Sequence, residues 1–89
     1  MDLGIRGKRG LVCAASKGLG RGCAEALAAA GVDLVINSRT EAEITRTAHE
    51  IAERHGVTVT PVAADITTEA GRARVLEAVG HGDILVTNA

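Results

Sequence analysis

Apolar and polar residues along this chain fall into two alternating patterns. Short runs rich in Val, Leu and Ile predict buried strands, because they are too short for helices and are bounded by glycines or polar residues. These runs cover residues 10–15, 32–39, 57–63 and 83–89. Between them, small and apolar residues recur three and four positions apart, which predicts amphipathic helices. The helices are expected over residues 18–30, from Thr40 to Gly56, and after Thr67 or Thr68.

Residues typical of helix ends mark these boundaries. Gly31 supplies a C-terminal stop for the first helix. Thr40 and Glu43 have the spacing of a capping box, which predicts the start of the second helix. Thr67 or Thr68 is expected to cap the third helix. The apolar residues of this third helix are expected on one side: Val75, Leu76 and Val79.

The order of elements predicts the fold class. A βαβαβαβ chain with right-handed crossovers forms a Rossmann-type doubly wound parallel sheet, α/β in class, with strand order 3-2-1-4. Pro61 is expected to cost the third strand one ladder hydrogen bond, which favours an edge position. In this order the fourth strand leaves an apolar edge, so we expect the sheet to be incomplete and further chain to follow Ala89.

Composition and charge narrow the classes of function. Hydrophobic residues make up 46% of the 89 residues, charged residues 24%, and the net charge is −1. This balance offers no electrostatic footprint for nucleic acid. No apolar stretch reaches the roughly 20 residues that span a bilayer, and the N-terminal residues lack the apolar centre of a signal peptide. We therefore expect no membrane association and a cytoplasmic location.

The cysteines and histidines give no sign of a metal site. Cys13 and Cys23 lie in apolar surroundings at a spacing that suits neither metal ligands nor a disulfide framework, so both are expected to be small buried thiols. The three histidines are expected to be solvated: His49, His55 and His81.

A glycine-rich turn follows the first strand in the stretch LVCAASKGLGRG, residues 11–22. Gly18 and Gly20 allow the backbone to approach a ligand closely, and free N–H groups at a helix start attract phosphate. A P-loop is excluded because Lys17 precedes Gly18 and no Ser or Thr follows. A plain connection between strand and helix is the alternative interpretation.

The end of the second strand favours a phosphate ligand. An acidic residue about 20 positions beyond the glycines is typical of NAD binding, whereas an Arg there accommodates the 2′-phosphate of NADP. This chain has Asn37, Ser38 and Arg39 at that place, with no carboxylate until Glu41. Lys17 adds a second positive charge in the glycine turn. We therefore expect an NADP site, with a solvated loop as the alternative for Arg39.

Two further strand ends face the same crevice. Asp65 and Ile66 follow the third strand, where Asp65 could accept a hydrogen bond from an adenine amino group or serve only as a turn residue. Asn88, at the end of the fourth strand, is expected to fix neighbouring backbone or to contact the cofactor.

Taken together, these residues resemble the N-terminal part of a short-chain dehydrogenase/reductase, especially the bacterial 3-oxoacyl-acyl-carrier-protein reductase-like members. The family's Thr-Gly-x-x-x-Gly-x-Gly turn is similar to residues 13–20, its Asp-hydrophobic adenine contact to Asp65-Ile66, and its Asn-Asn-Ala-Gly motif to residues 87–89. Cys13, Ala14 and Thr87 depart from these motifs, and Ala14 requires a negative φ. The resemblance implies these cofactor-binding residues: Ala14, Ser16, Lys17, Gly18, Leu19, Gly20, Ser38, Arg39, Asp65, Ile66, Asn88 and Ala89.

The resemblance also implies an activity. It suggests an NADPH-dependent oxidoreductase of fatty acid metabolism that reduces a carbonyl, such as a 3-oxoacyl thioester or another small molecule, and that assembles as a homo-oligomer, a homotetramer. Residues 1–89 would be its cofactor-binding half. The family's catalytic Ser, Tyr and Lys lie beyond the matching region, and the chain contains no Tyr, so these residues alone are expected to be inactive.

Two other classes of protein compete with this interpretation. A non-catalytic NADP-binding or interaction module that ends at Ala89 would explain the same motifs. A methyltransferase-like Rossmann domain is disfavoured, because Ser38 and Arg39 suit a phosphate that its ligand lacks.

Overall fold

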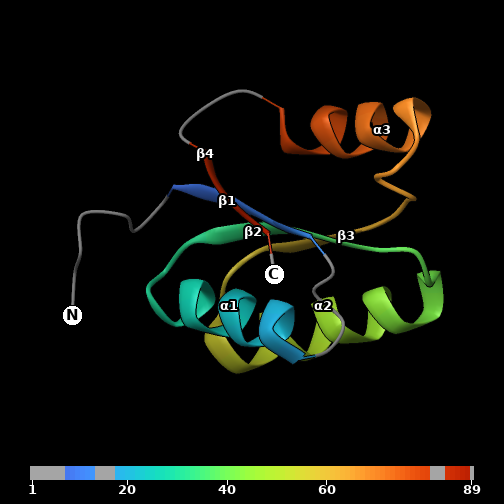
Figure 1. Ribbon diagram of the computed structural model, residues 1–89. Helices are drawn as coiled ribbons and strands as arrows, with labels where there is room; N and C mark the ends of the chain where they lie inside the picture. The colour runs from blue at the N-terminus through green and yellow to red at the C-terminus, as the bar shows by residue number, and fades with distance from the viewer. Residues whose placement is uncertain (1–7, 14–17, 81–83, 89) are drawn as a thin grey trace.

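The computed structural model describes residues 8–13, 18–80 and 84–88. Strands and helices alternate along the chain, as Figure 1 shows. The elements are β1 (Arg9–Cys13), α1 (Gly18–Ala29), β2 (Asp33–Ser38), α2 (Glu41–His55), β3 (Val59–Ala63), α3 (Glu69–Val79) and β4 (Ile84–Asn88). All seven predicted elements are present, with ends that differ by a few residues.

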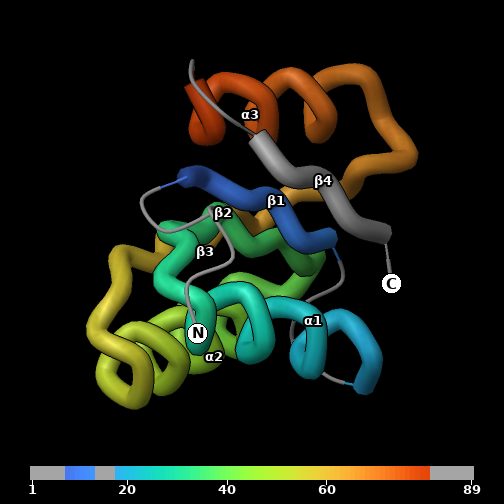
Figure 2. The backbone as a smooth tube through the Cα atoms, turned by 90° about the vertical axis from the view of Figure 1, so that its left-hand side faces the viewer, coloured from blue at the N-terminus to red at the C-terminus, as the bar shows by residue number. Residues whose placement is uncertain are grey.

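The strands form one parallel sheet in the order β3-β2-β1-β4, which confirms the predicted Rossmann-type topology. Helices α1 and α2 cover one face of this sheet, and α3 covers the other (Figure 1; Figure 2). Since every strand runs in the same direction, the carboxyl ends of β1, β2 and β3 meet at one edge. In open α/β sheets this edge is where ligands bind.

Two aliphatic clusters fill the layers on either side of the sheet. One packs α1 and α2 against the sheet through Val12, Ala24, Ala28, Val32, Leu34, Ile36, Ile44, Ala48 and Ile51. The other packs α3 through Leu11, Cys13, Val35, Val62, Ala64, Val75 and Val79. The prediction for Leu76 is wrong, because its side chain is 66% exposed while Val75 and Val79 are buried.

Pro61 lies in β3, at one end of the sheet order, as predicted. The expected loss of a ladder hydrogen bond is wrong. Leu34 donates to the Thr58 carbonyl at 2.8 Å and Ala64 donates to the Ser38 carbonyl at 3.1 Å, so even-numbered residues of this segment direct their backbone groups toward β2. Pro61 occupies an odd-numbered position that faces away from β2, where its missing N–H costs the ladder nothing.

The predicted capping box of α2 does not form. Thr40 occupies the N-cap position, but its side chain makes no capping hydrogen bond. Its own backbone N–H donates instead to Ser38 Oγ at 3.3 Å, and Glu41 and Glu43 place negative charge in the first turn. The C-terminal end is confirmed, because Gly56 adopts the left-handed conformation with φ 69°.

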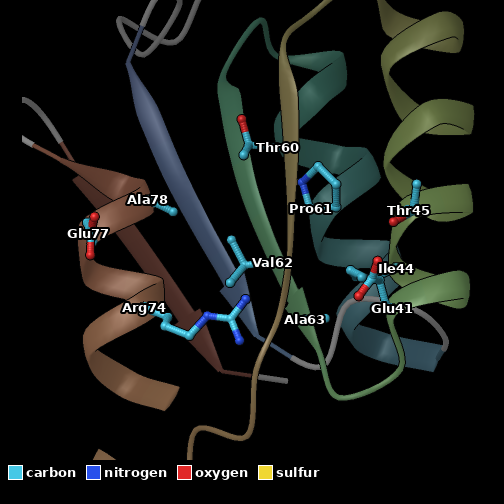
Figure 3. A pocket seen from close by; sticks show the side chains of 10 residues that line it. All are labelled: Glu41, Ile44, Thr45, Thr60, Pro61, Val62, Ala63, Arg74, Glu77 and Ala78. Atoms are coloured by element: carbon cyan, nitrogen blue, oxygen red, sulfur yellow. The ribbon is translucent and has the colours of Figure 1, made fainter. Parts of the chain in front are cut away.

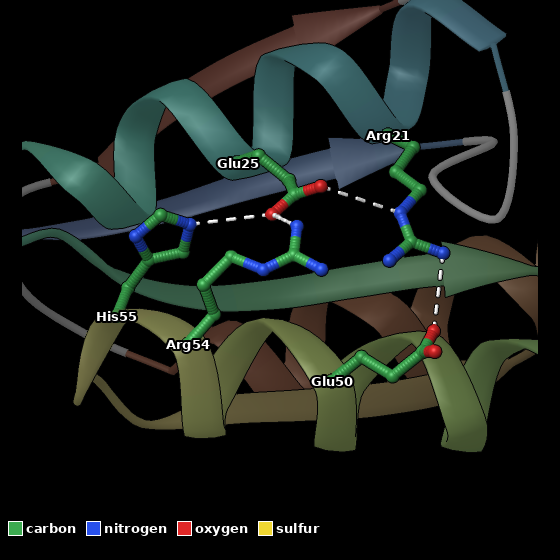
Figure 4. Close-up of polar contacts among 5 residues, drawn as sticks. All are labelled: Arg21, Glu25, Glu50, Arg54 and His55. Carbon is green, nitrogen blue, oxygen red and sulfur yellow. Dashed lines mark hydrogen bonds and ion pairs between the residues drawn. The ribbon is translucent and has the colours of Figure 1, made fainter.

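Helices α1 and α2 are joined by a network of charged side chains centred on Glu25 (Figure 4). Its carboxylate accepts from Arg54 at 2.6 Å, from His55 at 3.2 Å and from Arg21 at 3.5 Å. Arg21 also pairs with Glu50 at 3.1 Å. The expectation of a solvated His55 is therefore wrong, since its side chain is only 19% exposed and bonded.

The two cysteines and the other two histidines differ in exposure where the structure describes them. Cys13 is buried, as predicted, whereas Cys23 is half-buried. His49 is exposed, as predicted, and the side chain of His81 lies outside the described residues. Among the described helices, none is both long and apolar enough to cross a membrane.

Candidate functional site

The segments that follow β2 and β3 meet at the carboxyl edge of the sheet. Ser38 lies opposite Ala63 in the register, and its carbonyl accepts the Ala64 N–H at 3.1 Å. Arg39 continues from Ser38, and Asp65 continues from Ala64. The Arg39 charge is near enough to help lower the pKa of Asp65. The structure thus brings together the two predicted contacts to an adenosine group.

Arg39 has a guanidinium that is open to a ligand. The residue is exposed, and it forms no hydrogen bond or ion pair with any residue that the structure describes. Its neighbour Ser38 is half-buried at the very end of β2. A planar guanidinium beside a hydroxyl suits the geometry of a phosphate dianion.

The Asp65 carboxylate is oriented by hydrogen bonds from Thr67, two residues later in the chain. Its Oδ1 accepts from the Thr67 N–H at 2.9 Å and from the Thr67 hydroxyl at 2.6 Å. These two bonds, with a smaller contribution from Arg39, lower the pKa of Asp65 against a small opposing effect of burial. The carboxylate is charged at neutral pH, and its Oδ2 has no described hydrogen-bond donor. Ile66 is half-buried and packs against the cluster beneath α3.

The first residues of α3 and its N-cap are hydrogen-bonded to the turn at Asp65 and Ile66. The Thr68 hydroxyl donates to the Asp65 carbonyl at 2.8 Å and accepts from the Gly71 N–H at 3.0 Å, which confirms Thr68 as the cap. Arg72 donates to the Ile66 carbonyl at 3.2 Å. Gly71 approaches the turn so closely that a Cβ there would lie 1.8 Å from the Asp65 carbonyl oxygen.

Asn37 is a residue at this edge to which the sequence analysis gave no role. It is 2% exposed, and its Nδ2 donates to the carbonyls of Val62 and Ala64, each at 3.0 Å. A signal was present in the sequence, because an amide in an otherwise apolar strand must find hydrogen-bond partners when it is buried. The partners themselves could not be read from the sequence.

The glycine turn is described only from Gly18 onward. Gly18 begins α1 with φ 62°, a left-handed conformation that favours glycine. Gly20 is buried, and Leu19 is 82% exposed. The predicted contacts Ala14, Ser16, Lys17 and Ala89 lie outside the described residues. The backbone of Asn88 pairs with Cys13, and its side chain also lies outside them.

A trough of about 550 Å³ lies elsewhere, along the outer edge of β3 (Figure 3). Its walls come from α2, β3 and α3, and Arg74 reaches into it from α3 toward Val62. None of the predicted cofactor contacts whose side chains the structure describes lines this trough. In the described part of the chain, no three His, Cys, Asp or Glu side chains gather in a way that could hold a metal ion.

Comparison with known proteins gives consistent matches. The sequence profile of the short chain dehydrogenases matches residues 8–89. L-xylulose reductase from Mesocricetus auratus is 40% identical over 100% of this chain and 34% of its own length. A 3-oxoacyl-acyl-carrier-protein reductase from Aquifex aeolicus is 32% identical over 100% of this chain and 38% of its own length.

Solved structures agree with these matches. L-sorbose reductase from Gluconobacter frateurii, complexed with NADPH and L-sorbose, superimposes with a TM-score of 0.92 at 38% identity. That superposition covers 100% of this chain and 35% of the reductase. The chain thus spans about a third of the length of the proteins that it matches.

Proposed function

This chain belongs to the short chain dehydrogenase family, and from that premise we propose that it supplies the cofactor-binding half of an NADPH-dependent carbonyl reductase. The observation that carries the proposal is the exposed guanidinium of Arg39, which pairs with none of the described residues and lies beside Ser38, at the place where the fold presents the adenosine ribose. The similar L-sorbose reductase was solved with NADPH, which supports the same choice of cofactor.

Each described residue has a separate task in this proposal. Arg39 and Ser38 bind the 2′-phosphate, and the charged Asp65 accepts from the adenine amino group with the oxygen that Thr67 leaves open. Ile66 offers an apolar surface beside the adenine. The N–H groups at the start of α1, from Gly18 to Gly20, face the pyrophosphate. When bound, NADPH supplies the hydride, and these residues orient it.

The other predicted contacts complete the same proposal. Ala14, Ser16 and Lys17 in the glycine turn, together with Leu19, surround the pyrophosphate, and Asn88 and Ala89 lie toward the nicotinamide side. Residues 1–89 contain no Tyr, so the proton donor that the family uses would come from outside these residues. We therefore expect no carbonyl reduction by residues 1–89 alone. The expected homo-oligomer and cytoplasmic location belong to this proposal too.

Two classes of ketone are candidate substrates, and both come from the similar proteins. A 3-oxoacyl thioester agrees with the similarity to the Aquifex aeolicus reductase at 32% identity. A small polyhydroxy ketone is the second candidate, because the L-xylulose reductase and L-sorbose reductase matches reach 40% and 38% identity. Both candidates require transfer of hydride to a ketone carbon.

The test is an assay of NADPH oxidation with the protein as its gene encodes it. L-xylulose, L-sorbose and an acetoacetyl thioester serve as substrates, and NADH replaces NADPH in parallel reactions. Substrate-dependent oxidation of NADPH that exceeds that of NADH is the expected result. A protein that binds NADPH but oxidises it with none of a broad panel of ketones would favour the non-catalytic binding module instead.

A further inference from the structure

We infer that Asn37 is a positioning residue that sets the preference of this site for a 2′-phosphorylated adenosine, although it touches no ligand itself. The inference rests on the proposed function, because it concerns how the same site holds the adenosine half of NADPH. Asn37 and Thr47 are the two buried polar side chains among the described residues, and Asn37 alone lies in the sheet.

The two amide protons of Asn37 are divided between two carbonyls of one neighbouring strand end. Nδ2 lies 3.0 Å from the Val62 oxygen and 3.0 Å from the Ala64 oxygen. An Asp at this position would present no donor, and a Ser would present one. Because the amide is buried, its removal would take two hydrogen bonds from a buried part of the sheet.

These bonds join the two segments that would hold the ligand. Asn37 is followed directly by Ser38 and Arg39, and Ala64, one of the two residues whose carbonyls accept from Asn37, is followed directly by Asp65 and Ile66. Besides the β2–β3 ladder, which pairs Asn37 with Val62 and Ser38 with Ala63, the backbone bond from the Ala64 N–H to the Ser38 carbonyl ties the same two strand ends. The Asn37 side chain therefore adds two hydrogen bonds to the ladder at the point where the segments that carry Arg39 and Asp65 leave the sheet, and it helps to fix their spacing.

A rigid adenosine makes that spacing matter. Its adenine and its 2′-phosphate are attached to one ribose, which limits their separation, so Asp65 and Arg39 can both bind the ligand only if the two loops keep a distance within that range. If the end of β2 is held less firmly against β3, the ligand contacts Asp65 or Arg39 but not both at once. An adenosine without a 2′-phosphate makes no use of the Arg39 contact, so it loses less affinity. The preference for the phosphate, rather than affinity in general, is what Asn37 sets.

The test measures binding of adenosine 2′,5′-bisphosphate and of ADP, which lacks the 2′-phosphate, by calorimetry on the protein as its gene encodes it. We expect Asn37→Ala to lower the ratio of the two affinities by about tenfold, equivalent to one charge-assisted contact. Asn37→Ser, which keeps one donor, should give an intermediate ratio and serves if Asn37→Ala does not fold. Ile51→Val is the matched control, because Ile51 is buried in α2 and belongs to the opposite cluster.

The outcomes separate the two claims. A loss of thermal stability in all three variants, with a lowered ratio only in the Asn37 variants, supports the inference. A wild-type preference that survives both Asn37 substitutions within twofold overturns the inference alone. A wild-type protein with no preference for the bisphosphate overturns the proposed function, and the inference with it.

Discussion

Gly71 and Asp65 are in such close contact that any side chain on Gly71 would collide with the backbone of Asp65. A Cβ built on Gly71 lies 1.8 Å from the Asp65 carbonyl oxygen and 2.9 Å from Thr68 Oγ1. Both neighbours belong to the turn that orients the Asp65 carboxylate. The first turn of α3 and the proposed adenine contact therefore depend on a glycine at this position.

We expect Gly71→Ala to destabilise the protein by about 2 kcal/mol, because the clash is with backbone that cannot move aside without breaking the Thr68 cap. Affinity for adenosine ligands should fall as well, since the turn at Asp65 shifts. Urea unfolding and calorimetric titration with NADPH measure the two effects.

Gly22→Ala provides the matched control. Gly22 lies in α1, and a Cβ there has no heavy atom within 4 Å. In a helix interior, Ala is favoured over Gly by about 0.5–1 kcal/mol, so this variant should be more stable than the wild type. Equal stability changes in the two variants would refute the close contact at Gly71.

Arg39→Asp should reverse the choice of cofactor. It replaces the guanidinium beside Ser38 with a carboxylate that repels a phosphate and can accept from ribose hydroxyls. Hydrogen bonds to charged groups contribute about 1.5–3 kcal/mol each, so NADPH affinity should fall by about tenfold or more. Arg46→Asp makes the same change of charge on the exposed side of α2 and should leave the preference for NADPH in place. Competitive titration of both cofactors measures the effect.

The network at Glu25 should make the protein sensitive to acid. Burial raises the pKa of Glu25, but hydrogen bonds from His55, Arg54 and Arg21 and the Arg54 charge outweigh it and bring the pKa below 4.5. The unfolded chain therefore binds this proton at a higher pH than the folded chain does. The contribution of Glu25 is complete above pH 4.5 and is lost as pH falls through the lower folded value.

Glu25→Gln tests this dependence. The variant should lose about 1 kcal/mol of stability at pH 7, and its stability should fall less steeply than that of the wild type below pH 5. Glu53→Gln is the control, because among the described residues Glu53 pairs with His49 alone, and both side chains are more than 70% exposed. Urea unfolding between pH 3 and pH 8 provides the measurement, and parallel curves for the wild type and Glu25→Gln would contradict it.

The two cysteines should differ in reactivity. Burial raises the pKa of the Cys13 thiol, which leaves little thiolate at neutral pH, and Cys13 is only 8% exposed. Cys23 is half-buried on α1. A thiol reagent at pH 7.5 should modify Cys23 first and Cys13 only on unfolding. Equal rates for the two thiols in the native protein would show that β1 is more accessible than the structure indicates.

The fold could be predicted from the sequence because its signals are local and agree with one another. Short aliphatic runs, helical spacing and glycines at helix ends all point to the same alternation of strands and helices, and the parallel order follows from the crossover rule. The error at Leu76 arose because three apolar residues on α3 share a side by spacing. Only Val75 and Val79 lie within the arc that the sheet covers.

The site was only partly predictable for a physical reason. That Ser38, Arg39 and Asp65 would lie at one edge could be predicted, because the carboxyl ends of parallel strands meet there. Asn37, Gly71 and His55 act through partners 25, 6 and 30 residues away, respectively, in the sequence. The partners of Asn37 and His55 depend on the register of β3 and on the packing of α1 against α2, and the contact of Gly71 depends on the geometry of the turn before α3.

The central claim is that the ends of β2 and β3 form a site for a 2′-phosphorylated adenosine. The most direct measurement is a side-by-side calorimetric titration of the wild-type protein with NADPH and NADH at one ionic strength. We expect NADPH to bind about tenfold more tightly or better, because Arg39 and Ser38 contribute only when the 2′-phosphate is present. Equal affinities, or tighter binding of NADH, would contradict the claim.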